Sequence, residues 1–484
     1  MTEFWKEHSR DATVEEMMLD SRAKELTQHE LPEILSVLPC LAGSRVLELG
    51  AVRRYTSHLL TKAKHVTAVD FMESFVEKNR KDNGHHKNAT FIQADVTKLE
   101  VPQNSVDVIF SNWLLMYLSD EELKSILEKM LGWLRPGGFL FFRESCNHHS
   151  GDSKRDFNPT CYRTDAQYSH LASTVEAEGP EGGQKFGFNI VLKKKVQAYI
   201  EMKKNPNQVC WLLEKVTRTS NTQDGFTTFQ QFLDNQQYTS RGILRYEKIF
   251  GAGYVSTGGP STTKEFVDML NLKPGQKVLD VGCGIGGGDF YMAKSFGVEV
   301  LGLDLSNNMV DIAMERAAAE KLPTVQFEVA DATKRMFPEG SFDVIYSRDT
   351  ILHIDDKLAL FKRFHSWLKP GGQLLISDYC CGEKPWTPVF EVYVKQRGYI
   401  LYTTSQYGKF LEEAGFCNVQ AEDRTAQFIQ VIETELQKAE AIKDEFTEEF
   451  SEEDYFAIVN GWKEKLGRSR NGDQRWGLFY ATRD

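Results

Sequence analysis

The stretch Val278-Leu-Asp-Val-Gly-Cys-Gly-Ile-Gly-Gly-Gly288 decides the fold of this chain. It joins an apolar strand, which ends in an acidic residue and a glycine, to a glycine run that leads into a predicted helix. Glycines at this place let the backbone press against a nucleoside cofactor. The first half of the chain carries a second copy, Val46-Leu-Glu-Leu-Gly-Ala-Val-Arg-Arg-Tyr55, which has lost most of the glycine run. We therefore predict two cofactor-binding domains in tandem, the first with an altered loop.

Further motifs repeat in the same order in both halves. Asp70 and Asp304 each end an apolar strand, and Asp95 corresponds to Asp331. The offset between the copies stays between 232 and 236 residues, which is typical of duplicated domains and not of a short-period solenoid. The other matching pairs are Val106–Ser111 with Phe342–Ser347, and Trp133–Gly138 with Trp367–Gly372.

Length and composition agree with this interpretation. A chain of 484 residues is long for one core and favours two or three domains. Its net charge of −11 offers no basic field to nucleic acid or to an anionic membrane. No stretch approaches the ~18 apolar residues of a membrane span, and the N-terminal residues lack the apolar core of a secretion signal. The eight cysteines show no metal-ligand spacing, so we expect reduced thiols in a cytoplasmic protein and no metal site.

The order of predicted elements gives the domain boundaries. Strands alternate with helices from about residue 46 to 145, which predicts a parallel, doubly wound α/β sheet with helices on both faces. We expect loops over 146–190, and a solvated face at the basic run Lys193–Lys195. The predicted organisation is a first domain over 1–217, a linker over 218–228 and a second domain over 229–484. The second domain begins with a helical lid, 229–250, and a glycine-rich loop, 251–259.

The motifs after the glycine run distinguish S-adenosylmethionine from NAD. Asp304 can accept hydrogen bonds from the ribose hydroxyls of either cofactor. Asp331, at the end of a third apolar strand, could accept from an adenine amino group. The later strand Phe342–Ser347 and the turn Trp367–Gly372 complete an order that resembles class I methyltransferases. The resemblance implies two tandem Rossmann-like class I methyltransferase domains with mostly parallel, doubly wound sheets and helical lids; the alternative is a Rossmann domain of another activity.

The first domain keeps the acidic positions but not the loop. Members of the methyltransferase family typically read Gly-Ala-Gly-Ile-Gly-Arg where this chain has Gly50-Ala51-Val52-Arg53-Arg54. Valine does not readily adopt a positive φ, and added cationic charge near a sulfonium is unfavourable. Two interpretations stay open: the domain binds its cofactor through a rearranged loop, or it is a weakened or structural domain.

The second domain carries a candidate acid–base pair. Asp349 and His353 are four residues apart, so on a helical turn they would share one face. Asp349 could hold an ammonium group, and His353 could take a proton from it. A pocket of tyrosine hydroxyls with one arginine and one lysine would suit a phosphate monoester. The candidates are Tyr238, Tyr246, Tyr254, Tyr379, Tyr393, Tyr399, Arg397 and Lys465.

These residues resemble phosphoethanolamine N-methyltransferases over nearly the whole chain. In the second domain the resemblance rests on the motifs Asn235–Thr239, Tyr246–Gly259, Tyr346–His353, Tyr393–Tyr399 and Gln474–Gly477. In the first domain it rests on Phe4–Ser9, Thr13–Asp20 and Phe141–Ser145, which are similar to two-domain members.

The resemblance implies three S-adenosylmethionine-dependent N-methylations that convert phosphoethanolamine to phosphocholine, the later ones in domain two. Tyr238 and His353 would be the catalytic pair. The implied cofactor contacts are Gly50, Arg54, Asp70, Asp95, Val96 and Asn112 in domain one, and Val255, Ser256, Gly282, Gly284, Asp304, Asp331, Ala332 and Arg348 in domain two. The implied substrate contacts are Ser145, Ser150 and Tyr162 in domain one, and Gln237, Tyr246, Asp349, Tyr379, Tyr393, Arg397, Tyr399 and Lys465 in domain two.

Two alternatives remain from the sequence. In the first, only domain two is catalytic and domain one is a structural or regulatory module. In the second, the enzyme methylates a lipid or another small molecule. The expected partners are small phosphobase substrates, without nucleic acid or a membrane span, and we expect a monomer.

Overall fold

The computed structural model describes residues 2–8, 11, 13–51, 54–153, 157–179, 183–218 and 229–484. The chain divides into two compact units, Met1–Phe229 and Gln230–Asp484, and each is described by itself. The predicted linker, 218–228, lies outside the described residues except for Arg218, which ends the last strand of unit one.

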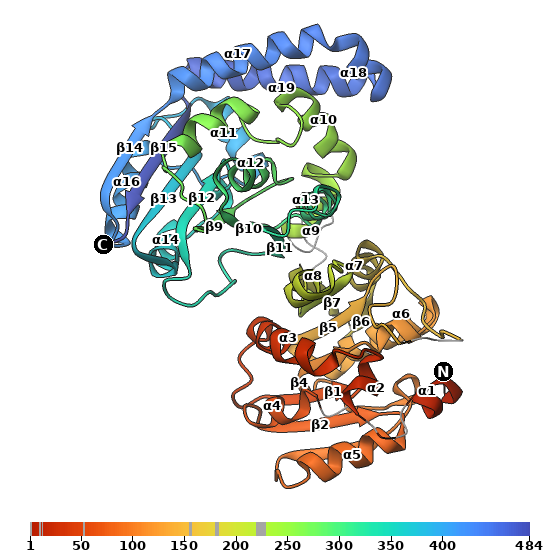
Figure 1. Ribbon diagram of the computed structural model, residues 1–484. Helices are drawn as coiled ribbons and strands as arrows, with labels where there is room; N and C mark the ends of the chain where they lie inside the picture. The colour runs from red at the N-terminus through yellow and green to blue at the C-terminus, as the bar shows by residue number, and fades with distance from the viewer. Residues whose placement is uncertain are drawn as a thin grey trace. The chain divides into compact units, whose positions relative to one another are not determined.

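Unit one is a mixed sheet with helices on both faces (Figure 1). The strand order is β3-β2-β1-β4-β5-β8-β7. The strands from β3 to β5 are parallel to one another. β8 pairs antiparallel with β5, β7 pairs antiparallel with β8, and β6 pairs antiparallel with β7. The strands are β1 (Arg45–Leu49), β2 (His65–Asp70), β3 (Ala89–Gln93), β4 (Val106–Asn112), β5 (Leu134–Ser145), β6 (Glu176–Glu178), β7 (Lys185–Lys195) and β8 (Gln208–Arg218). The helices are α1 (Thr2–His8), α2 (Val14–Met18), α3 (Ala23–Val37), α4 (Thr56–Leu60), α5 (Glu73–Asn83), η1 (Val96–Lys98), η2 (Leu115–Tyr117), α6 (Asp120–Trp133), α7 (Asp165–Thr174) and α8 (Gln197–Lys203).

Unit two repeats this architecture. Its strand order is β11-β10-β9-β12-β13-β15-β14, parallel from β11 to β13 and antiparallel beyond. The strands are β9 (Lys277–Val281), β10 (Glu299–Asp304), β11 (Val325–Ala330), β12 (Phe342–Arg348), β13 (Leu368–Cys381), β14 (Cys417–Asp423) and β15 (Gln474–Thr482). The helices are α9 (Phe229–Phe232), η3 (Leu233–Gln237), α10 (Ser240–Phe250), α11 (Gly259–Asp268), α12 (Gly287–Phe296), α13 (Asn307–Glu320), η4 (Ile351–His353), α14 (Lys357–Trp367), α15 (Pro388–Arg397), α16 (Thr404–Glu413), α17 (Thr425–Ala441), α18 (Lys443–Glu449) and α19 (Glu452–Arg470).

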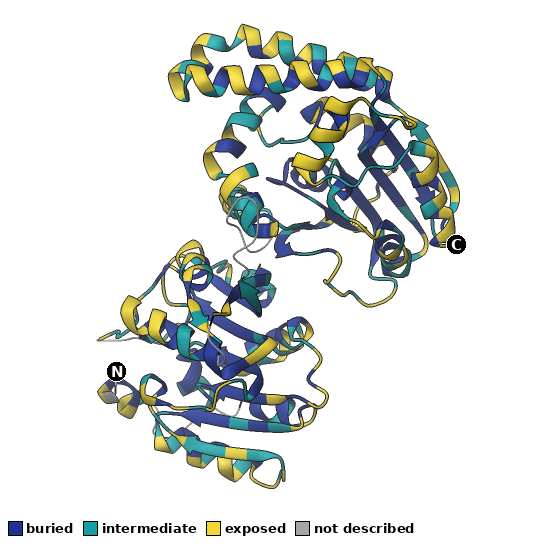
Figure 2. Cartoon of the chain, turned by 180° about the vertical axis from the view of Figure 1, so that it is seen from behind, coloured by how far each residue is buried: buried dark blue, intermediate teal, exposed yellow. Residues whose placement is uncertain are grey.

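The sheets form the cores because helices cover both of their faces. The central strands are buried along almost their whole length, as Figure 2 shows in dark blue. Leu47 lies beside Ile109 in unit one, and Leu279 lies beside Ile345 at the same register in unit two. Continuous apolar strands of this kind are typical of parallel sheets buried on both faces. The repeated sequence motifs therefore produce the predicted α/β fold twice.

Two expectations were wrong. The basic run of β7 is not solvated: Lys193 is fully buried with its Nζ 3.0 Å from Asp165, and Lys194 Nζ lies 3.0 Å from Glu33. The region expected to be loops contains α7, whose N-terminus has a reciprocal capping box between Thr164 and Gln167. Within the described residues, no helix is long and apolar enough to cross a membrane.

Candidate functional site

The glycine loop of domain two follows β9 and bends back toward the sheet. Gly282 and Gly284 have positive φ angles of 83° and 55°. A Cβ atom on Gly284 would stand 2.8 Å from Val255, which belongs to the lid loop. The Gly284 N–H donates to Asp304 Oδ2 at 3.0 Å. Because Gly282 and Gly284 have no side chains, a nucleoside cofactor could approach the backbone of this loop closely. The loop therefore fits S-adenosylmethionine, the predicted cofactor.

The acidic residues predicted for the cofactor lie at the same sheet edge. Asp304 ends β10 and is half-buried; the loss of solvent around it raises its pKa to about 6, so it is mostly ionised at neutral pH. Asp331 and the buried Ala332 follow β11, and Asp331 Oδ1 accepts from the Thr333 N–H at 2.9 Å. The carboxyl ends of parallel strands meet at this edge, as ligand binding in doubly wound folds requires.

Arg348 at the end of β12 joins the lid loop to the sheet. Its buried guanidinium donates to Thr257 O at 2.6 Å, Ser377 Oγ at 3.2 Å and Thr263 Oγ1 at 2.8 Å. Val255 and Ser256 lie in the same loop, just before Thr257. Arg348 thus fixes the loop that carries two of the predicted cofactor contacts.

Asp349 and His353 do not share a helical face as predicted. Asp349 has φ +50°, a left-handed conformation, and the 3-10 turn η4 begins only at Ile351. The Asp349 carboxylate accepts from Trp476 Nε1 at 2.8 Å and from Ser377 Oγ at 3.2 Å. A third donor is the Thr257 N–H of the lid loop, at 3.3 Å. These bonds orient the carboxylate, and Trp476 was missed although its motif Gln474–Gly477 stood out in the sequence.

His353 lies at the end of η4, against the ring of Tyr399. The two ring centroids are 5.1 Å apart with an interplanar angle of 72°. Burial, together with the charges of Lys357 and Arg397, lowers the pKa of His353 to about 4. The imidazole is therefore neutral at physiological pH and can accept a proton.

The predicted phosphate-binding residues form one cluster around Tyr399. Its ring centroid lies 5.7 Å from Tyr393 and 6.4 Å from Tyr379. Lys465 Nζ donates to the Tyr379 hydroxyl at 3.2 Å, and Arg397 Cζ lies 5.9 Å from the Tyr393 ring centroid. Sequence reasoning missed a second guanidinium: Arg468 Cζ lies 3.7 Å from the Tyr393 ring centroid, one turn from Lys465 on α19.

Tyr238 lies between the cofactor edge and this cluster. Gln237 Nε2 donates to its hydroxyl at 3.1 Å. Burial raises the pKa of Tyr238, and the neighbouring Tyr246 and Asp304 raise it further. Tyr246 packs at 5.9 Å on Trp462, whose ring also faces the Lys465 ammonium. Tyr254 is not in the cluster; it lies beside Gly287 near the glycine loop.

Domain one contains a pocket that joins its predicted cofactor and substrate residues. Gly50, Arg54, Asp70 and Asn112 line the pocket together with Ser145, Ser150 and Tyr162. Its walls also include Trp5, Met17, Met18, Leu19, Tyr55, Phe71, Phe75, Trp113 and Tyr117. Asp95 and Val96 do not line it; the Asp95 side chain caps η1 by accepting from the Thr97 N–H at 3.0 Å.

The altered loop of domain one brings a cation into the pocket wall. Val52 and Arg53 lie outside the described residues, but Arg54 is buried and forms an ion pair with Glu30 of α3. Arg143 of β5 also pairs with Glu30, at 2.9 Å. The expected repulsion of a sulfonium by Arg54 is thereby reduced, because the buried carboxylate neutralises part of the charge.

The arginine at the end of the central strands lies on different strands in the two repeats. In domain two, Arg348 on β12 faces Ser377 on β13, whereas in domain one Asn112 on β4 faces Arg143 on β5. Arg143 Nη1 donates to Asn112 Oδ1 at 3.2 Å. Likewise, Trp113 takes the place of Asp349, keeps its positive φ, and donates from Nε1 to Gln208 at 2.8 Å. The backbone of the site is repeated while its chemistry differs.

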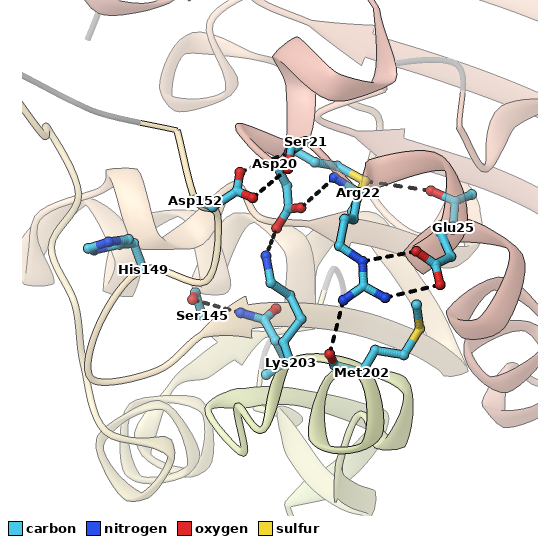
Figure 3. A network of polar contacts seen from close by, with 12 residues as sticks. Asp20, Ser21, Arg22, Glu25, Ser145, His149, Asp152, Met202 and Lys203 are labelled. Carbon is cyan, nitrogen blue, oxygen red and sulfur yellow. Dashed lines mark hydrogen bonds and ion pairs between the residues drawn. The ribbon is translucent and has the colours of Figure 1, made fainter.

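Polar contacts hold the loop that carries Ser150 (Figure 3). Asp152 accepts from the Ser21 N–H at 2.8 Å and from the Ser21 hydroxyl at 2.6 Å. Lys203 forms an ion pair with Asp20, and the Ser153 N–H donates to Leu19 O at 3.0 Å. The loop therefore lies against the turn after α2, and both segments line the pocket.

Comparisons with known proteins agree with this geometry. The family described as methyltransferase domain matches residues 46–138 and 278–372. Phosphoethanolamine N-methyltransferase 3 of Arabidopsis thaliana is 55% identical over 99% of this chain and 97% of its own length. The chain belongs to the phosphoethanolamine N-methyltransferase family. A wheat (Triticum aestivum) phosphoethanolamine N-methyltransferase 1 is 56% identical over 99% of this chain and 96% of its own.

A solved member of the phosphoethanolamine N-methyltransferase family shares the two-domain fold. Phosphoethanolamine N-methyltransferase 2 of Haemonchus contortus, in complex with phosphomonomethylethanolamine and S-adenosylhomocysteine, has a TM-score of 0.77 and 27% identity. The match covers 95% of this chain and 98% of that chain. The predicted fold class, two tandem class I methyltransferase domains, is confirmed.

Asp280 and Asp289 form a pair of buried carboxyl groups near the glycine loop of domain two. This pair predicts that the free energy of unfolding of domain two falls as pH rises. Burial raises the pKa of both groups, that of Asp289 to about 7, and the neighbouring Asp289 raises the pKa of Asp280 further. The folded state thus keeps a proton that the unfolded chain releases near pH 4, and this stabilisation is lost as pH rises through about 7. We expect Asp289→Asn to raise the unfolding free energy of domain two at pH 8 by about 2 kcal/mol.

Urea unfolding at pH 6 and pH 8 measures this effect. The gain should be larger at pH 8 than at pH 6, because wild-type Asp289 carries its proton at the lower pH. Asp268→Asn, at an exposed ion pair with Lys264, is the control and should change little at either pH. An equal effect of Asp289→Asn at both pH values would contradict the raised pKa of Asp289 in the folded state.

Proposed function

We propose that both domains of this S-adenosylmethionine-dependent phosphoethanolamine N-methyltransferase are catalytic, and that together they convert phosphoethanolamine to phosphocholine. Domain one performs the first methylation and domain two the later ones. The observation that carries the proposal is the pocket of domain one, which joins Gly50 and Asp70 to Ser145 and Tyr162. A purely structural module would have no need of such a pocket.

In domain two the reaction needs a free amine lone pair. An alkylammonium has a pKa near that of lysine, ~10, so the substrate arrives protonated and cannot attack. Asp349 holds the ammonium, and the neutral His353 accepts its proton. S-adenosylmethionine, when bound, would supply the methyl group to the nitrogen as its sulfur–methyl bond breaks, which leaves S-adenosylhomocysteine. Tyr238 closes the lid segment over the site and excludes water, which aligns the reacting groups.

The cluster around Tyr399 would hold the phosphate of the substrate. Tyr246, Tyr379, Tyr393 and Tyr399 offer hydroxyl donors, and Arg397 and Lys465 offer positive charge. Charge-assisted hydrogen bonds of this kind suit a phosphate monoester. The anchored phosphate places the amine at the other end of the molecule, between Asp349 and His353.

Domain one would use other groups for the same reaction. Trp113 stands at the place of Asp349, and Tyr117 at the place of His353. The pocket instead presents the hydroxyls of Ser145, Ser150 and Tyr162. Asp70, whose pKa burial raises to about 7, takes the place of Asp304 for the cofactor ribose.

Cofactor binding by the full chain tests the proposal. Calorimetry should find two equivalents of S-adenosylmethionine per chain, and Asp70→Ala and Asp304→Ala should each remove one. The control Asp268→Ala, in an exposed ion pair, should bind two. One equivalent in the wild type, unaffected by Asp70→Ala, would instead support a structural or regulatory role for domain one.

We also propose that the enzyme is a cytoplasmic monomer that acts on small phosphobases and not on lipid or nucleic acid. All eight cysteines, each within the described part of the chain, are free thiols, as a reducing compartment favours.

A further inference from the structure

The turn that carries His353 is too short to be stabilised by its own hydrogen bonds alone. Ile351–His353 is one turn of 3-10 helix, and such turns leave carbonyl groups that need other donors. Lys357 supplies them: its Nζ donates to Ile351 O at 2.7 Å and to Ile354 O at 2.9 Å. Lys357 is the first residue of α14, and only 2% of it is exposed.

The surroundings of Lys357 fix its ammonium in place. The buried carboxyl of Asp378 on β13 lies near enough to interact with its charge, and the Tyr407 hydroxyl donates to Asp378 Oδ2 at 3.2 Å. The rings of Tyr402 and Tyr407 lie 5.6 and 6.0 Å from Lys357 Nζ. A buried ammonium is tolerated only with partners of this kind, so Lys357 is a rigid donor.

A second contact holds the other side of the turn. The Ile400 N–H donates to Leu352 O at 2.7 Å. Ile400 directly follows Tyr399, whose ring packs against His353. The imidazole is thus set between the capped turn and the tyrosine cluster.

Domain one holds its equivalent turn by the same pattern but with different residues. Directly after η2, Leu118 takes the place of Ile354, and its carbonyl accepts from Arg163 Nη2 at 2.7 Å. The carbonyl of Met116, at the place of Leu352, accepts from the Cys161 N–H at 2.7 Å. Arg163 comes from the segment before α7, whereas Lys357 comes from α14. A cation caps the same carbonyl in both repeats although its source differs, which indicates that the cap itself is needed.

We propose that Lys357 is a positioning residue for methyl transfer in domain two, where its ammonium fixes the turn so that the His353 imidazole faces the substrate amine. Arg163 caps the η2 turn of domain one in the same way, and this turn places Met116 and Tyr117 in the pocket wall. The inference rests on the proposed role of His353 as the proton acceptor.

The charge of Lys357 gives a second readout. Lys357 on α14, Arg397 at the end of α15 and Tyr399 shortly after it are among the groups that face His353. Removing the Lys357 charge should raise the pKa of His353, an effect that NMR of the imidazole nitrogens measures without turnover.

The test uses Lys357→Met in the full chain with phosphodimethylethanolamine as substrate. We expect kcat to fall about 10- to 100-fold with KM nearly unchanged, because displacement of a reacting group by about 1 Å has this effect. Lys357→Arg should recover most of the loss. The first methylation, measured with phosphoethanolamine, reports on domain one and should be unaffected, whereas Arg163→Met should impair that step and spare the later ones.

The outcomes separate the two proposals. Unchanged kcat in a Lys357→Met enzyme that still binds cofactor in domain two would overturn the positioning role. If the Lys357→Met variant does not fold, the Arg163→Met variant tests the positioning role instead. A folded Arg163→Met enzyme with a normal first methylation would overturn that role. If His353→Ala loses turnover and Lys357→Met does not, only the positioning role of Lys357 is refuted. If His353→Ala turns over normally, the role of His353 as proton acceptor is refuted.

Discussion

Replacing His353 by alanine is expected to stop the methylation of phosphodimethylethanolamine while the first methylation of phosphoethanolamine continues. His353 is the neutral, half-buried imidazole at the end of η4, and its pKa, lowered to about 4, leaves it unprotonated at pH 7. Without it, the ammonium held by Asp349 loses the proton acceptor that we propose. General-base catalysis contributes about 10²- to 10⁴-fold, so kcat/KM for the dimethyl substrate should fall by that factor.

Steady-state kinetics with the two substrates measures this difference within one chain. His365→Ala is the matched control, since His365 packs on Phe416 at 5.2 Å and belongs to α14, outside the tyrosine cluster. It should leave both activities within about twofold of wild type, because a substitution away from the site removes no group that contacts substrate or cofactor. Equal loss of both methylations in His353→Ala would mean that one shared site performs them, and no loss would show that His353 is not the base.

The fold could be predicted because the motifs that define it are local. An apolar strand, an acidic residue and a glycine form a single piece of chain, and the steady offset between Asp70 and Asp304 revealed the duplication. Residues at the ends of parallel strands must meet at one edge, so Asp304, Asp331 and Arg348 could be assigned to a common site.

Contacts that depend on distant partners could not be predicted. Lys193 looked solvated as part of a basic run, yet it is buried and its partner is Asp165, on a helix in a region that the sequence predicted to be loops. The capping box at Thr164 and Gln167 was the available signal for that helix. The left-handed backbone at Asp349 removed the expected helical face, and the role of Trp476 depends on a strand added more than a hundred residues later.

Glu30 is expected to be the most important single charge for the stability of domain one. Its carboxylate is fully buried and pairs with both Arg54 and Arg143, the latter at 2.9 Å with neither side chain exposed. Arg143 also lies 3.9 Å from the Trp113 ring centroid, so the cluster supports the floor of the pocket. Glu30→Gln leaves two buried guanidinium groups without their counter-charge. Breaking a buried ion pair from one side costs about 3–5 kcal/mol, which is a large part of a domain's stability.

Hydrogen exchange in the full chain can assign this loss to one domain. The amides of β1 and β4 should lose protection in Glu30→Gln, while those of β9 and β12 keep it. Glu25→Gln is the matched control, because Glu25 lies on the same helix and pairs with Arg22 at 2.9 Å on the exposed surface, where such a pair contributes about 0–1 kcal/mol. If Glu30→Gln changed stability no more than Glu25→Gln, the arginines would have to be compensated by another anion. If it unfolds domain one selectively, the Glu30 carboxylate is the counter-charge on which the buried Arg54 and Arg143, and with them domain one, depend.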